Sequence, residues 1–324
     1  MAAEGIMDGA ITSPRVAPAV APAIALAIAP AVAPAVAPRV APAESQAGCA
    51  AGASGAAGGA AAEHGGAADG AIAAENLCFA YGGGAPVLSG VSCRIAPGAV
   101  TALMGANACG KTTLMRLMTK GLRPDSGRVL LGGRDIAGIG LRDFARRAAI
   151  VHQKNTAPDD LSVKRLVGYG RIPHAPPFSP PSKRDGERVA WAMSATGVSD
   201  IADRPMGALS GGQRQRAFIA MALAQETKLL FLDEPTAYLD VRYQVEILRL
   251  IRELNRSHGI TIVKVLHDIN QALAYSDEVI GLRGGRVLVQ GPPRGVIDSR
   301  AIQELFRIRL EVKTDGRHMW VLPV

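Results

Sequence analysis

The sequence predicts an α/β fold with a parallel central sheet, because three short apolar runs each lead into polar residues suited to binding phosphate or metal. The run GAVTALM enters a glycine-containing loop at residue 105, KLLFLDEP ends in Asp233 and Glu234, and GITIVKVLHDI reaches His267. Short apolar runs of this kind are typical of buried parallel strands, whose carboxyl ends form the ligand-binding edge of a sheet. AENLCFAYGG and VSCRI add two further strands separated by a turn.

Composition limits the partners without choosing one. The 324 residues have a formal net charge of +8, and residues 1–72 contribute five acidic and two basic side chains, so the remainder has a net charge of +11. A basic body indicates nucleotide, an anionic membrane face or nucleic acid as partner. The four cysteines lack metal-ligand spacing, which favours a reducing compartment and no zinc site. They are Cys49, Cys78, Cys93 and Cys109.

Residues 1–72 differ from the rest and predict a disordered tail rich in Ala, Pro and Gly. Proline recurs about every four residues from Pro14 to Pro42, and a Gly/Ala-rich stretch follows. Residues 16–38 are uncharged, but their prolines would remove helical hydrogen bonds that a bilayer cannot replace. The acidic start lacks the basic opening of a signal peptide. A start codon assigned too far upstream is an alternative, although a start at Met7 would keep the repeat.

The stretch GANACGKTT fits the phosphate-loop pattern G-x-x-x-x-G-K-[ST], and it lies between a predicted strand and the predicted helix LMRLMTK. Backbone N–H groups of such a loop and of the helix N-terminus form a cradle of partial positive charge for phosphate. Lys111 is placed to reach the β- and γ-phosphates, and the Thr112 hydroxyl to bind Mg²⁺. The predicted nucleotide-binding residues here are Gly105, Ala106, Asn107, Ala108, Cys109, Gly110, Lys111, Thr112 and Thr113.

Two acids at the end of a buried strand supply the chemistry that a phosphate loop lacks. Asp233 is the predicted Mg²⁺ partner, and Glu234 is placed to polarise an attacking water as general base. The alternative is a solvated pair at a strand end. His267 follows another predicted sheet strand, so we expect it beside the same pocket, in contact with the γ-phosphate rather than as an ordinary polar loop residue.

The stretch ALSGGQRQRAFIAMALAQ, residues 208–225, places a Ser-Gly-Gly turn directly before a predicted helix. Ser210 is the predicted N-cap. Two glycines at this point indicate that backbone comes close to another group.

From about residue 73 to its end, the chain resembles the nucleotide-binding subunit of an ABC transporter. The phosphate loop, LSGGQ at residues 209–213, LLFLDEP and His267 occur in the family's order and at similar spacing. Gln153 matches the family's Q-loop, Asp240 ends its D-loop YLD, and Tyr81 stands where the family places an aromatic ring under adenine. The resemblance implies a P-loop NTPase (RecA-like) core with an antiparallel β subdomain and an inserted α-helical subdomain, at about residues 154–208.

The resemblance also implies a shared active site. In this family two ATPase domains face each other head to tail, so that Ser210, Gly211, Gly212 and Gln213 of one chain cap the ATP bound by the other. Gln153 is implied to sense metal and γ-phosphate. Since the chain has one phosphate loop and one LSGGQ, we expect a dimer, with a second copy as partner and a paralogue as the open alternative.

Two phosphate-loop positions depart from the family's Gly-Pro-Asn-Gly. Ala106 is expected to be harmless. Ala108 replaces a glycine in the cradle, where a positive φ would cost a residue with a Cβ on the order of 1 kcal/mol. We therefore expect ATP binding to survive in weakened form.

The segments LVGYGRIPH and VLHDINQALAYSDEVIGLRGGRVLVQGPP resemble ferric-siderophore importer ATPases most closely, with haem and cobalamin importers as near relatives. The resemblance implies two integral membrane permease subunits, a periplasmic substrate-binding protein acting indirectly, and a peripheral position on the cytoplasmic face of the inner membrane. Helices broken by a Pro-rich loop at residues 173–181 suit the subdomain that receives the permeases.

Two other functional classes fit parts of the sequence. Soluble ABC proteins act on ribosomes or DNA, but they usually have two cassettes in one chain or a coiled-coil insertion. About a hundred residues without heptads separate Lys111 from Ser210, so no nucleic-acid partner is expected. A regulatory module that binds nucleotide without turnover would rest on Ala108 alone.

Overall fold

The computed structural model describes residues 70–176, 179–316 and 318–323. The predicted tail therefore lies outside the described residues except for its last three positions, and Cys49 lies outside them as well. Within the described part of the chain, no helix is both long and apolar enough to cross a bilayer.

The centre of the molecule is a six-stranded sheet in the order β10-β9-β3-β8-β7-β6, parallel except for the edge strand β10. The parallel sheet expected from the sequence is thus confirmed. Its strands are β3 (Val100–Met104), β6 (Ala148–Val151), β7 (Leu229–Asp233), β8 (Thr261–Val265), β9 (Glu278–Arg283) and β10 (Arg286–Gly291).

Every residue of β3, β7 and β8 is buried, because the sheet is covered on both faces. Alternate side chains enter two different cores. In β7, Leu230 and Leu232 join the core beneath the helices, whereas Leu229 and Phe231 face the core shared with a second sheet. Burial on both faces explains why these strands read as unbroken apolar runs.

The second sheet is four-stranded and antiparallel, in the order β2-β1-β4-β5. It packs with α2 (Lys111–Met118), which contacts both this sheet and β7. Helix α2 therefore holds the phosphate loop between the two sheets. The strands are β1 (Ile72–Ala80), β2 (Pro86–Ile95), β4 (Ser126–Leu131) and β5 (Arg134–Asp135).

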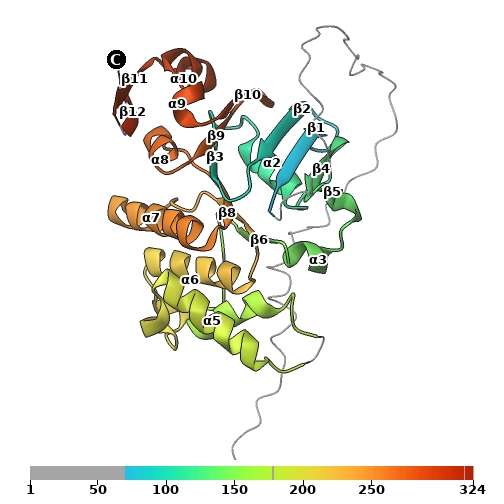
Figure 1. Ribbon diagram of the computed structural model, residues 1–324, viewed down its shortest axis with the longest axis vertical. Coiled ribbons are helices and arrows are strands. Elements are labelled where there is room, and N and C mark those ends of the chain that lie inside the picture. The colour runs from blue at the N-terminus through green and yellow to red at the C-terminus, as the bar shows by residue number, and fades with distance from the viewer. Residues whose placement is uncertain (1–69, 177–178, 317, 324) are drawn as a thin grey trace, which may run out of the picture.

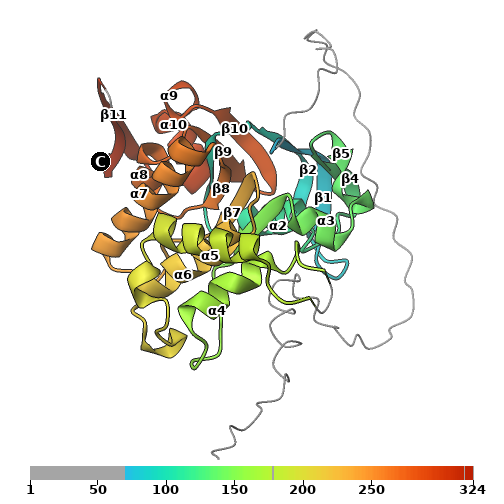
Figure 2. The ribbon, with the colours of Figure 1, turned by 60° about the horizontal axis from the view of Figure 1, so that its bottom comes forward.

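A group of helices forms the opposite end of the molecule, with α5 and α6 far from β1, β2 and β4 in Figure 1. Figure 2 shows α4, α5 and α6 gathered below the sheets. Capping boxes begin α5 and α6, with Ser182 and Asp185 for α5 and Ser210 and Gln213 for α6. The helices in this part of the chain, residues 141–258, are α3 (Leu141–Ala145), α4 (Val163–Gly168), α5 (Lys183–Thr196), α6 (Gly211–Ala224) and α7 (Val241–His258).

The C-terminal part forms a two-stranded antiparallel sheet and three short helices, with β12 packed on α8. Its elements are α8 (Ile269–Ala274), α9 (Pro293–Val296), α10 (Ser299–Phe306), β11 (Leu310–Asp315) and β12 (His318–Pro323).

The segment YGRIPH, residues 169–174, fastens the helical group to the core. The buried Arg171 guanidinium pairs with Asp185 of α5 at 2.8 Å and donates to the Ala224 carbonyl at the end of α6 at 2.7 Å. The Pro173 carbonyl accepts hydrogen bonds from Arg142 and Arg146, and the His174 ring contacts the Gln225 carbonyl at 2.8 Å. One short segment thus joins α3, α5 and α6.

Candidate active site

The residues predicted to bind phosphate or act on it lie close together because of the order of the strands in the central sheet. Strands β3, β8, β7 and β6 are neighbours and run parallel, so the loops after them leave the same edge of the sheet. Lys111, His267, Glu234 and Gln153 lie on those loops or just after them. The sequence could not show that β8 separates β3 from β7, and this order is what brings the loops together.

The phosphate loop turns through three residues with positive φ: Gly105 at 139°, Ala108 at 59° and Gly110 at 106°. A Cβ on Gly105 would lie 2.2 Å from the Leu282 carbonyl oxygen, so only glycine fits there. The positive φ considered for Ala108 is present. The loop closes around Lys111, whose buried Nζ donates to the carbonyl oxygens of Gly105 and Ala106 at 2.9 Å each.

Glu234 is held by two of the predicted residues. The Gln153 amide donates from Nε2 to Glu234 Oε2 at 2.5 Å, and His267 Nε2 contacts Glu234 Oε1. Glu234 itself has a φ of 48°, a left-handed conformation directly after β7. Strained backbone of this kind is concentrated at functional sites.

Asp233, the last residue of β7, has a buried oxygen suited to a cation. Its Oδ1 has no hydrogen-bond partner among the described residues. Burial, and then repulsion from Glu234, raise the pKa of Asp233 to about 6, against the opposing effects of Arg116, His267 and Lys111. An unsatisfied buried carboxylate oxygen is costly without a ligand, and oxygen donors of this type suit Mg²⁺.

Tyr81 lies beside the start of α2. Its hydroxyl is 3.3 Å from Thr113 Oγ1, and its ring packs edge-on against Phe79 with centroids 4.8 Å apart. About half of Tyr81 is exposed. The aromatic ring is thus placed where it could stack on a base.

The Ser-Gly-Gly turn has a role within its own chain. Ser210 is the N-cap of α6, as expected, since its Oγ accepts from the Gln213 amide and Gln213 Oε1 accepts from the Ser210 amide. A Cβ on Gly212 would lie 2.8 Å from Cδ1 of Tyr243 in α7. Packing against α7 therefore requires a glycine here independently of any nucleotide, a reason that the sequence did not reveal.

The comparisons with known proteins agree with this geometry. Residues 88–237 match the ABC transporter family. The chain is 42% identical to the ferric enterobactin transport ATP-binding protein FepC of Escherichia coli (strain K12) over 241 residues, which cover 74% of this chain and 89% of that protein. The chain belongs to the ABC transporter ATP-binding family. It is an ATP-binding protein and an ATPase.

Further relatives of this ABC ATPase include the iron(3+)-hydroxamate import ATP-binding protein FhuC of Bacillus subtilis (strain 168), 41% identical over 76% of this chain and 91% of that protein. The hemin import ATP-binding protein HmuV of Bordetella pertussis is 39% identical over 74% of this chain and 93% of that protein.

Solved structures show the same fold. CbiO1 of Clostridium perfringens, described as part of the ABC transporter complex CbiONQ, aligns with a TM-score of 0.62 and 35% identity over 69% of this chain and 89% of that one. An inward-facing ABC transporter provisionally assigned to the metal-chelate type aligns with a TM-score of 0.67 and 28% identity over 78% of this chain and 97% of that one. The expected fold, a P-loop NTPase core with an antiparallel sheet, is confirmed.

The structure of this ABC ATPase adds a set of polar contacts that sequence reasoning missed. Thr236, after β7, contacts Gln271 of α8 at 3.4 Å, and the Gln271 amide donates to Gln244 of α7 at 2.7 Å. Gln244 in turn donates to the Leu239 carbonyl at 2.8 Å. The helix after His267 is thereby tied to the loop containing Asp240. No signal in the sequence distinguishes these amides from solvated helix positions.

Proposed function

We propose that this ABC ATPase energises the import of an iron(III)-siderophore complex across the inner membrane. The support is its 42% and 41% identity to proteins named for transport of ferric enterobactin and of iron(3+)-hydroxamate. Haem import is the second candidate, supported by the 39% identity to a hemin import protein.

The hydrolytic step rests on one observation, the placement of Glu234 between Gln153 and His267. In this proposal Glu234 accepts a proton from the attacking water, and His267 orients Glu234 and stabilises charge that develops on the γ-phosphate. Lys111 neutralises the phosphates from within the loop, and Tyr81 stacks on adenine. The backbone of residues 105–113 supplies the phosphate cradle.

The donor set fits a magnesium ion. Asp233 with its unsatisfied Oδ1, the Thr112 hydroxyl and the Gln153 amide oxygen would hold it. The bound ion would neutralise phosphate charge during hydrolysis. The Gln153 nitrogen already donates to Glu234, so this side chain would link the metal to the base.

The proposal includes a partner for the exposed Ser210 and Gly211. A second copy presents Ser210, Gly211, Gly212 and Gln213 to the ATP bound here, with Asp240 at the same interface. The dimer docks on two integral membrane permease subunits at the cytoplasmic face of the inner membrane, and a periplasmic binding protein delivers the cargo. Association with membrane permeases is supported by the transporter complexes among its relatives.

Glu234→Gln tests the base. Loss of a general base should lower steady-state phosphate release by about 100-fold or more while ATP still binds, so that an ATP-bound dimer accumulates in gel filtration. Glu187→Gln, the same change on an exposed position of α5, should hydrolyse ATP at the normal rate. Normal hydrolysis by Glu234→Gln refutes the base assignment, and full-speed hydrolysis by a strictly monomeric wild-type chain refutes the shared site.

The cargo is tested by deleting the gene. The deletion strain should lose uptake of radiolabelled iron supplied as a ferric siderophore and keep uptake of iron supplied as haem. Loss of haem uptake alone would replace the siderophore proposal with the haem one.

A further inference from the structure

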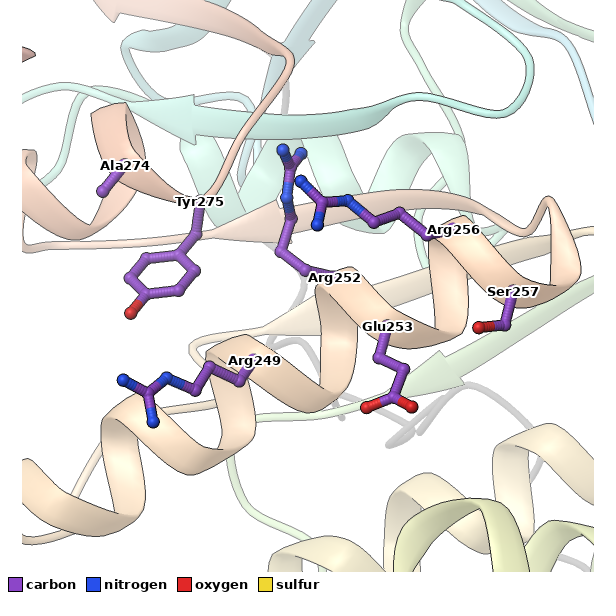
Figure 3. Close-up of a pocket in the computed structure, with 7 residues that line it drawn as sticks. All are labelled: Arg249, Arg252, Glu253, Arg256, Ser257, Ala274 and Tyr275. Carbon is purple, nitrogen blue, oxygen red and sulfur yellow. The ribbon is translucent and has the colours of Figure 1, made fainter. Parts of the chain in front are cut away.

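A hollow of about 450 Å³ lies outside the phosphate site, between α7 and the end of α8. Figure 3 shows Arg249, Arg252 and Arg256 of α7 along one wall and Tyr275, directly after α8, along another. We call the hollow formed by these four residues the arginine groove. Its volume is within the range of small-molecule sites, about 300–1,000 Å³.

The arginines share one side of α7 because they are spaced three and four residues apart. Arg252 is paired, with its Nη1 2.6 Å from Asp277 Oδ1. Among the described residues, Arg249 and Arg256 form no ion pair. Glu253 is the one acid among the lining residues, and its side chain extends away from those of Arg252 and Arg256 in Figure 3. Two free guanidinium groups therefore border the groove.

Helix electrostatics do not account for all three arginines. Basic residues stabilise the last turn of a helix, and Arg256 and His258 occupy the last turn of α7. Arg249 lies nine residues before the end of this helix at His258, beyond the reach of that effect. Like charges three or four positions apart on one helix repel one another, and an anion between them would relieve this repulsion.

Tyr275, which forms the wall opposite the arginines, is held by contacts with β8 and α8. Lys264, fully buried in β8, donates from Nζ to the Tyr275 carbonyl at 2.5 Å, and its ammonium group is 6.0 Å from the centre of the Tyr275 ring. Tyr275 is also joined to α8 through its amide, which donates to the Gln271 carbonyl at 3.1 Å. Tyr275 is thus held opposite the arginines by its backbone and by the contact of its ring with Lys264.

We propose that the arginine groove binds a phosphate group, with Arg249 and Arg256 as its charged ligands and Tyr275 as the opposite wall. Guanidinium groups donate paired hydrogen bonds that match phosphate oxygens, and this geometry favours phosphate over a monovalent spherical anion. The phosphate belongs either to a free phosphorylated solute or to an anionic phospholipid headgroup. The site is separate from the phosphate loop and needs no catalytic residue.

The test uses the full-length chain with its phosphate loop saturated by Mg²⁺ and a non-hydrolysable ATP analogue. Pyrophosphate is titrated by calorimetry, and in a second arm the protein is sedimented with phosphatidylcholine vesicles with or without phosphatidylglycerol. The double variant Arg249→Ala/Arg256→Ala should weaken binding at least about tenfold. Arg249→Lys/Arg256→Lys, which keeps the charge and loses the paired donors, should fall between it and the wild type.

Two further variants separate a built site from general charge. Arg300→Ala removes an exposed arginine of α10 and should leave binding unchanged. Glu253→Gln removes the groove's acid and should tighten binding. Saturable pyrophosphate binding supports a free solute, and sedimentation only with phosphatidylglycerol supports a headgroup. Binding in neither arm, or equal loss in Arg300→Ala and the double variant, overturns the proposal, while retained binding of the ATP analogue shows that each variant is folded.

Discussion

At the scale of single residues, two non-glycine residues of the site adopt left-handed backbone: Ala108 in the phosphate loop and Glu234 after β7. The conformation of Glu234 directs its carboxylate to Gln153 and His267, so its strain is compensated by contacts. Ala108 lies between Gly105 and Gly110, which tolerate positive φ without cost. The methyl group of Ala108 makes this left-handed conformation unfavourable.

We predict that Ala108→Gly relieves this strain. The free energy of unfolding should rise by about 0.5–1 kcal/mol, and ATP should bind up to about fivefold more tightly, because the loop reaches its binding shape at less cost. Urea unfolding and nucleotide titration measure the two effects. Ala106→Gly is the matched control, since Ala106 has no positive φ and gains nothing from glycine. Unchanged affinity and stability in Ala108→Gly would rule out strain at this position.

At the scale of elements, YGRIPH connects helices. Arg171 satisfies Asp185, the Ala224 carbonyl and Glu226, and it is buried while doing so. Hydrogen bonds from Ser182 and Arg171 lower the pKa of Asp185 to about 2. The bond to Ala224 fixes the end of α6, a few residues before β7 leads to Asp233. Arg171 therefore links the helical group to the segment of the chain that leads into β7.

We predict that Arg171→Ala lowers the free energy of unfolding by about 3–5 kcal/mol, because it leaves the buried Asp185 carboxylate without its cation. Arg188→Ala is the matched control. It loses only a half-exposed ion pair with Glu226, and should cost about 1 kcal/mol or less. Urea unfolding compares the two, and limited proteolysis should cleave first within residues 154–208. Equal effects of the two variants would show that Arg171 is not a structural connection.

At the scale of the whole molecule, one lysine of the described residues is fully buried within the central sheet. Lys264 is fully buried near the end of β8, and burial, followed by repulsion from Arg252, lowers its pKa from 10.5 to about 7. Below pH 7 the lysine is protonated in both the folded and the unfolded chain, so the full free-energy cost of burying its charge is present. Between pH 7 and 10.5 the unfolded chain holds a proton that the folded chain lacks, so this cost falls as pH rises.

Lys264→Met should therefore change the pH dependence of global stability. The stability of the variant relative to wild type should be greatest near pH 7 and should decrease steadily as the pH rises to about 10, whatever constant offset the lost bond to Tyr275 adds. Urea midpoints across this range give the difference. Ile262→Met, in the same strand, removes no titratable group and should give a difference that does not vary with pH. A pH-independent difference for Lys264→Met would show that the lysine keeps its proton on folding.

The local patterns of the sequence were sufficient to predict the strands that lead into the candidate site and the start of α6. The apolar runs before Gly105, Asp233 and His267 became β3, β7 and β8, and Ser210 became the N-cap of α6. Gln153 was found only by its match to a family motif, and its contact with Glu234 joins residues 81 positions apart. The packing of Gly212 against Tyr243 and the connections of YGRIPH were missed because their partners lie on other helices.

The sequence by itself determined the chemical groups of this ATPase and the strand ends on which they lie, since strand, loop and helix signals are local in the chain. Only the tertiary structure decided the order β3-β8-β7-β6, and with it the meeting of Gln153, Glu234 and His267. It also decided the burial of Lys264 and the free faces of Arg249 and Arg256. The physical reason is that burial and charge environment depend on which distant segments pack together, whereas a residue's type and its immediate neighbours do not specify those segments.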